Sequence, residues 1–265
     1  MNDRFDWRLA LMVVLTAAIL GATVLQILAP RLQQSLLSTP SYASGTPSIP
    51  VSGPAPLETP LTTPVAAHTS MAVGIVQMQQ DTFERTSQEG WGNATNGTPW
   101  IGDAQRPFFS VHNGIGLIGG ANGTLSALIG SQQENIDTLV FWSVTSFQRG
   151  QVTIQVVSRW HDDRNLYKAT VNGSVLTISK RLNGLSTVLA SVPFQAHGHT
   201  IYALRFRTEG TLLQAKVWQS SVSEPDTWMV STTDGTFARG RVGIRVRVEK
   251  DTTVRIHEFL AKSVP

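Results

Sequence analysis

Hydrophobic and polar residues alternate along most of the chain after residue 80, in short segments separated by glycine, asparagine and aspartate. Successive side chains of a β-strand point to opposite faces, so this alternation predicts strands with one buried face. No stretch of ten residues after Met78 has the spacing of an amphipathic helix. The clearest predicted strands are Gln151–Trp160, Leu166–Val171, Ser174–Arg181, Ser186–Val192, Thr200–Arg207, Thr211–Trp218, Arg241–Val248 and Thr253–Leu260.

Turn-forming residues lie between these segments. Asn172–Gly173 separates two predicted strands and is typical of a two-residue hairpin turn. Asn183–Gly184 ends a further strand, and Glu209–Gly210 links another pair. Many short strands with regular turns predict an all-β fold over residues 79–265, an antiparallel jelly-roll β-sandwich.

The N-terminal part of the chain follows a different pattern. Leu9–Ala29 contains no charged residue and is long enough, as a helix of about 30 Å, to span a bilayer. We expect an uncleaved signal anchor: residues 1–8 cytoplasmic, residues 9–29 a single transmembrane helix, and the C-terminal domain extracellular. A cleaved signal peptide is the alternative, although its apolar core would normally be shorter, about 7–15 residues.

Residues 30–78 connect the apolar segment to the predicted sandwich. Seven of the thirteen prolines fall between Gln33 and Met78, among serine, threonine and alanine. Such a segment cannot bury enough apolar surface to fold, and its prolines keep it extended. It is predicted to be a disordered stalk.

Composition narrows the possible functions. The chain has no cysteine, which excludes disulfides, zinc–thiolate sites, iron–sulfur clusters and thiol nucleophiles. The net charge of +3 is small, and no zinc-finger spacing or RNA-binding signature is present. We therefore expect no nucleic-acid partner and no cofactor, apart from the calcium ion considered below.

Several motifs carry a family resemblance. Asp81–Arg85, followed by Gly90–Ala94, resembles the opening of a bacterial laminin-G-like, concanavalin A-like jelly-roll domain. Further matching pieces are Gly97–Trp100, Asn165–Ala169, Val188–Ala190, Ala215–Trp218, Glu224–Trp228, Gly240–Arg245 and the last strand to Phe259. The resemblance covers residues 81–261. It implies a surface or secreted domain of a superfamily in which many members bind glycans, and it includes no fixed catalytic residues.

The sequence does not favour catalysis. Glycanases of the concanavalin-like fold carry a Glu-x-Asp-x-x-Glu pattern that places two carboxylates about 5 Å apart, and this chain has no such string. The adjacent Asp162 and Asp163 would point to opposite faces of a strand. A Ser-His-Asp triad remains open, because the domain contains five histidines, but no Gly-x-Ser-x-Gly elbow accompanies it.

The segment from Trp160 to Asn165 joins two predicted strands and is the first candidate site. Asp162, Asp163 and Asn165 offer oxygens for sugar hydroxyls or for Ca²⁺, which takes about six to eight oxygen ligands. Trp160 could stack on a sugar ring. The alternatives are an ordinary turn and a core position for Trp160, which shares its parity with Ile154 and Val156.

A cationic surface is the second candidate site. The apolar residues of three predicted strands form one face of each strand, which leaves their charged residues on the other. The outward positions are Arg205, Arg207, Lys216, Trp218, Arg241, Arg245 and Arg247. If the third strand belongs to the same sheet as the other two, these residues share a surface that suits carboxylate or phosphate groups. An ordinary solvated face is the alternative.

Together these features predict a membrane-anchored, extracellular, non-catalytic module that binds carbohydrate or an acidic polymer of the cell envelope. Two other functions remain open. One is a glycan-processing enzyme with an atypical active site, and the other is a structural or protein-interaction module on a stalk.

Overall fold

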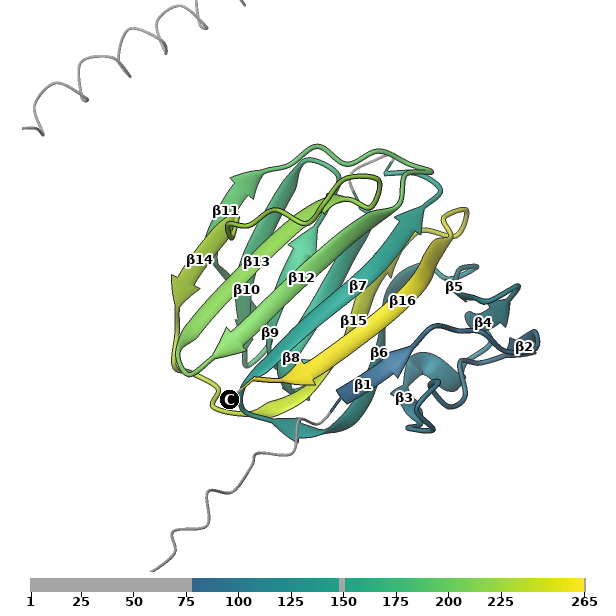
Figure 1. Cartoon of the computed structure of the whole chain (residues 1–265), viewed down its shortest axis with the longest axis horizontal. Coiled ribbons are helices and arrows are strands. Elements are labelled where there is room, and N and C mark those ends of the chain that lie inside the picture. Colours follow the sequence, from purple (N-terminus) through teal and green to yellow (C-terminus); the bar gives the residue numbers. More distant parts are fainter. Residues whose placement is uncertain (1–77, 148–150, 265) are drawn as a thin grey trace, which may run out of the picture. The chain divides into compact units, whose positions relative to one another are not determined.

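The computed structural model describes residues 78–147 and 151–264. These residues form two antiparallel sheets packed face to face, which confirms the predicted all-β sandwich (Figure 1). Within this described part, no helix has the length and apolar character needed to cross a membrane. The expected transmembrane helix over residues 9–29 and the stalk up to residue 77 lie outside it.

The larger sheet contains nine of the described strands, in the order β14-β13-β12-β7-β16-β5-β4-β2, with β1 also paired to β16. Their bounds are β1 Met78–Asp81, β2 Gln88–Glu89, β4 Phe109–His112, β5 Ile115–Ile118, β7 Ile136–Val144, β12 Tyr202–Glu209, β13 Leu212–Gln219, β14 Val230–Thr233 and β16 Val254–Ser263.

The smaller sheet contains seven of the described strands, in the order β11-β10-β9-β8-β15-β6-β3. Their bounds are β3 Trp100–Gly102, β6 Gly123–Gln133, β8 Thr153–Asp162, β9 Asn165–Val171, β10 Val175–Leu182, β11 Leu185–Pro193 and β15 Gly240–Val248. A single short 3-10 helix among the described residues, η1 Asp103–Gln105, follows β3.

All eight strands predicted from the alternation are present, with ends that differ by at most three residues. The Asn172–Gly173 turn is longer than predicted, because three residues separate β9 from β10. The Asn172 side-chain oxygen accepts hydrogen bonds from the backbone amides of Ser174 and Val175, which stabilises this longer turn. Asn183–Gly184 is the true two-residue turn, and both residues have positive φ angles, as a type I′ hairpin requires.

The core lies between the two sheets. Trp142, Phe206 and Phe259 from the larger sheet and Tyr167 and Ile244 from the smaller one are all buried in it. Polar contacts also cross this core; in one of them the hydroxyl oxygens of Ser158 and Thr208 lie 3.0 Å apart. Each hydroxyl satisfies the other, so neither is left as an unpaired buried group.

The Asp81–Arg85 motif has a structural role. The Asp81 carboxylate is fully buried, and the Trp100 indole nitrogen and both terminal nitrogens of Arg85 donate to it at 2.7–3.0 Å. The rings of Phe83, Trp91 and Trp100 pack against one another beside this carboxylate. The motif therefore fixes the first strand to the sandwich.

A β-bulge in β8 changes which face its last residues occupy. Arg159 has a φ of 48°, and the pairing of β8 with β9 shifts between Ser158 and Asp162. Beyond this extra residue, Trp160 lies on the outer face of the smaller sheet, where it packs against Val157 and Leu166. The alternative of a buried position for Trp160 is therefore met, since the residue is 8% exposed, but the cluster lies on the outer face and not between the sheets, because strict alternation does not allow for a bulge.

Candidate functional site

The expected single cationic surface does not exist. Arg241, Arg245 and Arg247 lie on β15, which pairs with β6 and β8 in the smaller sheet. Arg205, Arg207 and Lys216 lie on β12 and β13 in the larger sheet. Alternation correctly separated inward from outward residues, but the two cationic groups are on opposite outer faces of the sandwich.

On the larger sheet the cations are paired within the chain. The Arg205 guanidinium contacts the Asp137 carboxylate at 2.8 and 2.6 Å and the Glu224 carboxylate at 2.6 Å. The hydrogen bonds with Asp137 raise the pKa of Arg205 above its ordinary value, despite partial burial. The Lys216 ammonium lies 2.7 Å from Glu224, and Arg207 pairs with Glu209. These charges are already neutralised and are not free for an anionic ligand.

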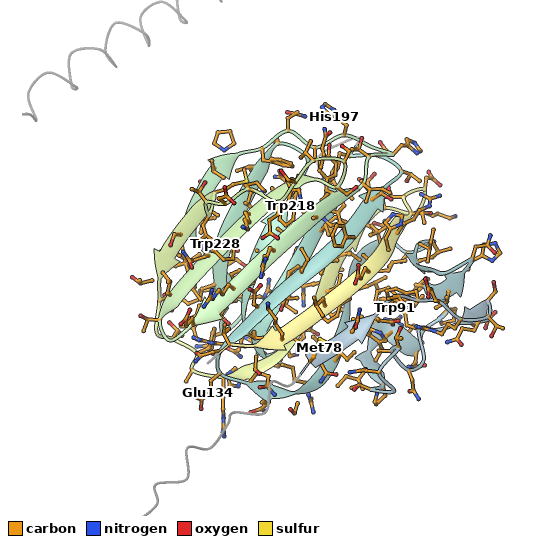
Figure 2. The ribbon with its side chains drawn as sticks, viewed as in Figure 1. Met78, Trp91, Glu134, His197, Trp218 and Trp228 are labelled. Atoms are coloured by element: carbon orange, nitrogen blue, oxygen red, sulfur yellow. The ribbon has the colours of Figure 1, made fainter. Side chains whose placement is uncertain are left out.

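Trp218 is also enclosed. Its side chain is turned to the outer face as predicted, but the residue is only 6% exposed. The Lys216 ammonium lies 5.9 Å from the Trp218 ring and 4.9 Å from the Trp228 ring (Figure 2). Trp228 and Glu224 both come from the segment between β13 and β14, which covers this part of the sheet. The expectation that Trp218 stacks on a ligand is therefore wrong.

The Trp160–Asn165 segment divides between two surfaces. Trp160 and Asp163 lie by Arg245, whose guanidinium is centred 5.3 Å from the Trp160 ring and donates to Asp163 at 2.7 Å. Arg247, farther along β15, donates to Gln151 at 2.9 Å. Asp162 and Asn165 face a different place, a pocket at the rim of the sandwich.

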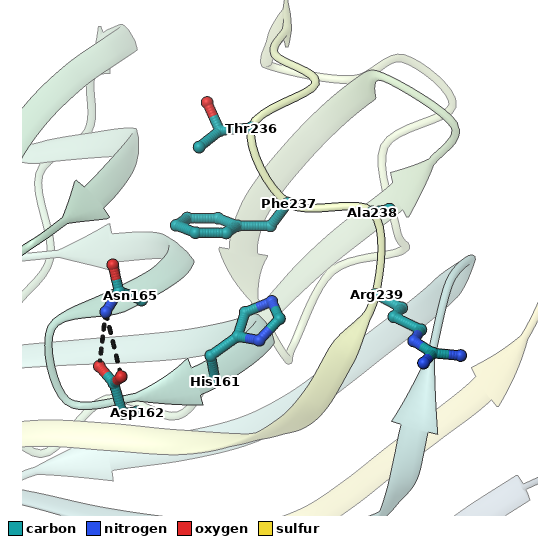
Figure 3. Close-up of a pocket in the computed structure, with 7 residues that line it drawn as sticks. All are labelled: His161, Asp162, Asn165, Thr236, Phe237, Ala238 and Arg239. Atoms are coloured by element: carbon teal, nitrogen blue, oxygen red, sulfur yellow. Dashed lines mark hydrogen bonds between the residues drawn. The ribbon is translucent and has the colours of Figure 1, made fainter.

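This rim pocket has a volume of about 560 Å³ (Figure 3). It lies where the β8–β9 turn meets the loop between β14 and β15. Its lining residues are His161, Asp162, Asn165, Thr236, Phe237, Ala238 and Arg239. The volume falls within the range of about 300–1,000 Å³ that is usual for small-molecule sites.

The β8–β9 turn presents a negative charge at the pocket. The Asn165 amide donates to both oxygens of the Asp162 carboxylate at 3.0 Å, and the Arg164 backbone amide donates to one of them at 2.7 Å. These hydrogen bonds, chiefly those from Asn165, lower the pKa of Asp162. The exposed carboxylate thus stays ionised and is held in one orientation.

The opposite wall of the pocket is held by a network of partly buried polar groups. The Tyr167 hydroxyl donates to the Asp234 carboxylate and accepts from the Phe237 backbone amide at 3.2 Å. The Lys180 ammonium donates to Asp234 at 2.6 Å and to the Thr236 hydroxyl at 2.8 Å. Burial raises the pKa of Tyr167, so its hydroxyl remains a donor at neutral pH.

Arg159 fixes the loop from the other side. Its guanidinium donates to the Phe237 carbonyl oxygen at 2.7 Å and to the Glu134 carbonyl oxygen at 3.0 Å. The Phe237 ring then lies 5.1 Å from the Tyr167 ring and 5.4 Å from the His161 ring, measured between centroids. The pocket is therefore preformed, with an aromatic side chain held rigidly in its wall.

Solved structures share this architecture. The chain is similar to xylan β-1,4-xylosidase from Bacillus halodurans C-125, with a TM-score of 0.53, 13% identity, and coverage of 70% of this chain but 39% of that one. It is also similar to a protein of unknown function from Shewanella oneidensis MR-1, with a TM-score of 0.52, 11% identity, and coverage of 71% and 86%. No family model and no curated protein matches the sequence. The chain has a jelly-roll sandwich fold.

The described residues do not gather a metal-binding set. Among residues 78–147 and 151–264, no group of three or more histidine, aspartate or glutamate side chains is placed to hold a metal ion. Asp162 and Asp163, which the sequence offered as calcium ligands, lie against Asn165 and Arg245 instead.

One serine–histidine pair lies on the outer face of the larger sheet. The Ser143 hydroxyl is 3.0 Å from Nε2 of His257, and burial lowers the pKa of that imidazole. In the part of the chain that the structure describes, no carboxylate hydrogen-bonds the other ring nitrogen. The pair therefore lacks the third member of a catalytic triad.

Sequence reasoning missed half of the pocket. Thr236, Phe237 and Arg239 belong to a loop after the short strand β14, which the alternation did not predict. A usable signal was present: Phe237 is a single aromatic residue in a polar, glycine-flanked segment, and functional residues are often found in such loops.

Proposed function

We propose that this chain is a non-catalytic module that binds carbohydrate in the rim pocket. The observation that carries the proposal is the composition of that pocket: one ionised acceptor, several neutral polar groups and two rings around a preformed space of about 560 Å³. The similar xylosidase shares only the fold with this chain, so the pocket is the basis of the proposal.

The pocket chemistry suits a sugar. Oδ1 of Asp162 already accepts two hydrogen bonds and Oδ2 accepts one, so Oδ2 can accept one more, from a sugar hydroxyl. Such a charge-assisted hydrogen bond is roughly twice as strong as a neutral one. The Thr236 hydroxyl and the Arg239 guanidinium add a neutral and a charged partner. The rings of Phe237 and His161 offer apolar surface for the C–H face of a pyranose.

We also propose the membrane anchor, the stalk and the extracellular location that the sequence predicts. Residues 9–29 would anchor the chain in the cell membrane, the stalk would extend from it, and the laminin-G-like sandwich would face the outside. Resistance of the full-length chain to extraction by alkaline carbonate, with the sandwich accessible to protease on intact cells, would support this placement. Release into the soluble fraction would contradict it.

The test is a glycan array probed with the full-length chain in mild detergent, because residues 9–29 are strongly apolar. We expect binding to a subset of glycans, and about tenfold weaker binding after His161→Ala or Arg239→Ser, since each removes a ligand contact. His197→Ala is the matched control. Glu134 is hydrogen-bonded to Arg159, which holds the pocket loop, and the exposed His197 lies at the opposite end of the sandwich from Glu134 (Figure 2).

Three results would contradict the proposal. Absence of binding to every glycan would favour a structural or protein-interaction module. Unchanged binding in both pocket variants would place the site elsewhere. Hydrolysis of the bound glycans would show that the chain is an enzyme.

A further inference from the structure

The outer face of the smaller sheet carries cations that the chain does not neutralise. The ammonium group of Lys168 on β9 and the guanidinium group of Arg181 on β10 form no hydrogen bond or ion pair with any residue in the described ranges. The Nε of Arg181 is buried without a hydrogen-bond partner there. Arg245 on β15 is the third cation, and its carboxylate partner Asp163 is 72% exposed.

Strand register places these residues on one surface. Lys168 is opposite Ser179 on β10, and Arg181 lies two residues beyond Ser179 on the same face. Arg245 is opposite Gln155 on β8, in the strand next to that of Lys168. Neighbouring strands are about 4.8 Å apart, so the three cations lie across a width of four strands.

The arrangement is unfavourable without a ligand. Burial lowers the pKa of Lys168, and the positive charges of Arg245 and Arg181 lower it further. Like charges close together on a sheet are destabilising, and a half-buried ammonium without a partner adds a desolvation cost. An anion from outside the chain would remove both penalties.

Unsatisfied neutral groups lie in the same place. Gln155 is 6% exposed; its amide nitrogen donates to Thr153 at 2.8 Å, while its amide oxygen has no partner among the described residues. The hydroxyl of Thr170, directly opposite Gln155 on β9, is likewise buried and unpaired within the described structure. Both oxygens are covered by the surrounding side chains, so they add an unfavourable contribution to this face without themselves offering a contact to a ligand.

We propose that Lys168, Arg181 and Arg245 form a subsite for the carboxylate of an acidic glycan. The proposal rests on carbohydrate binding in the rim pocket and adds the class of sugar, a uronate. The two sites adjoin through the β8–β9 turn, because Asp162 lines the pocket and the next residue, Asp163, pairs with Arg245. The carboxylate of the ligand would replace the exposed Asp163 carboxylate as the ion-pair partner of Arg245.

The test uses oligosaccharides of galacturonate, mannuronate and hyaluronan, each beside its carboxyl methyl ester, with the full-length chain and titration calorimetry. The ester keeps the hydroxyls and removes the charge. We expect at least one uronate to bind, and about tenfold weaker binding of its ester. Lys168→Met and Arg181→Met should each weaken uronate binding by about tenfold, while the ester is bound as before.

Lys262→Met is the matched control. Lys262 is an exposed lysine on β16 of the other sheet, so the variant makes the same charge change away from the subsite. Lys168→Met should also raise the melting temperature, by about 2–4 °C, because it removes an unpaired half-buried charge. Weaker binding together with higher stability separates a lost contact from a damaged fold.

Several outcomes would overturn the subsite. These are no binding to any of the three uronates, equal affinity for acid and ester, or an equal loss in Lys262→Met. Binding of duplex DNA with the same affinity as the uronate would show a general polyanion surface. Displacement of the uronate by inorganic phosphate at the same concentration would assign the cluster to phosphate. If neutral glycans still bind and depend on His161 and Arg239, only the subsite fails; if no glycan binds, the proposed function fails as well.

Discussion

Asp234→Asn tests how firmly the pocket wall is held. In the wild-type chain, the Asp234 carboxylate accepts hydrogen bonds from the Lys180 ammonium at 2.6 Å, the Tyr167 hydroxyl at 2.5 Å and the Thr236 amide at 2.9 Å. Asparagine has the same shape and keeps one acceptor oxygen. Its amide nitrogen, however, faces the Lys180 ammonium, so the charge-assisted bond is lost and the ammonium keeps only the Thr236 hydroxyl.

The expected loss follows from burial. The side chains of Lys180 and Asp234 are 20% and 12% exposed, which puts the pair between a surface ion pair and a fully buried one. Surface pairs contribute up to about 1 kcal/mol, and breaking a buried pair costs about 3–5 kcal/mol, so we expect a loss of about 2 kcal/mol. With a urea dependence of about 2 kcal/mol per M, the unfolding midpoint should fall by about 1 M at pH 7.

The pH dependence gives a second, independent check. Burial disfavours the charged form of Asp234, but the hydrogen bonds from Lys180, Thr236 and Tyr167 outweigh it and hold the pKa well below its usual range. A carboxyl group with a lowered pKa stabilises the fold above its unfolded pKa, about 3.9, and loses that contribution as the pH falls. At pH 3 the difference between wild type and Asp234→Asn should be smaller by ~1.3 kcal/mol than at pH 7.

Urea unfolding followed by tryptophan fluorescence at pH 7, 5, 4 and 3 measures both quantities. Glu84→Gln is the control, because Glu84 is exposed and makes no contact with this network. An unchanged midpoint at pH 7, or a difference between the two proteins that does not shrink below pH 4, would refute the assignment of Asp234 as the ionised centre of the pocket wall.

Three further substitutions test the rest of the structure. Asp81→Asn should destabilise the chain by about 3 kcal/mol in urea unfolding, since it leaves Arg85 without its buried charge partner; a loss under about 1 kcal/mol would contradict that role. Gly116→Ala should lower stability by about 1–3 kcal/mol in the same assay, because an added Cβ would lie 2.5 Å from the Phe83 ring, and a neutral effect would show that the ring can move. Glu224→Gln should release the segment between β13 and β14, seen as faster amide hydrogen exchange there with little change in the core; exchange at the wild-type rate would show that apolar packing alone holds that segment.

Much of the fold could be predicted from the sequence because strand formation is local. The period of two in β8 to β13, β15 and β16 follows from side chains that alternate between core and solvent, and Asn183–Gly184 marks a hairpin by its backbone preferences. The short strands β2, β3 and β14 carry too few residues to show a period.

The pairing of strands that lie far apart in the chain could not be predicted from the sequence. Alternation places Arg205 and Arg245 on outward faces, but nothing in either segment says which sheet it joins. β15 pairs with β6 and β8, both far earlier in the chain (Val248 is opposite Gly123, for example), and that choice depends on the packing of the whole core. The enclosure of Lys216 and Trp218 was equally hidden, because it depends on a later segment that contains no regular strand.

The bulge at Arg159 explains why the prediction of the rim site was only partly correct. A non-glycine residue with positive φ costs about 1–3 kcal/mol, and here two hydrogen bonds from the Arg159 guanidinium to the carbonyl oxygens of Glu134 and Phe237 offset that strain. The extra residue reverses the alternation, so Trp160 contacts Arg245 on the outer face and His161 contacts Phe237 at the pocket. Without the bulge these two side chains would exchange faces. The rim pocket therefore depends on one backbone irregularity, whose only trace in the sequence is an arginine within an otherwise regular strand.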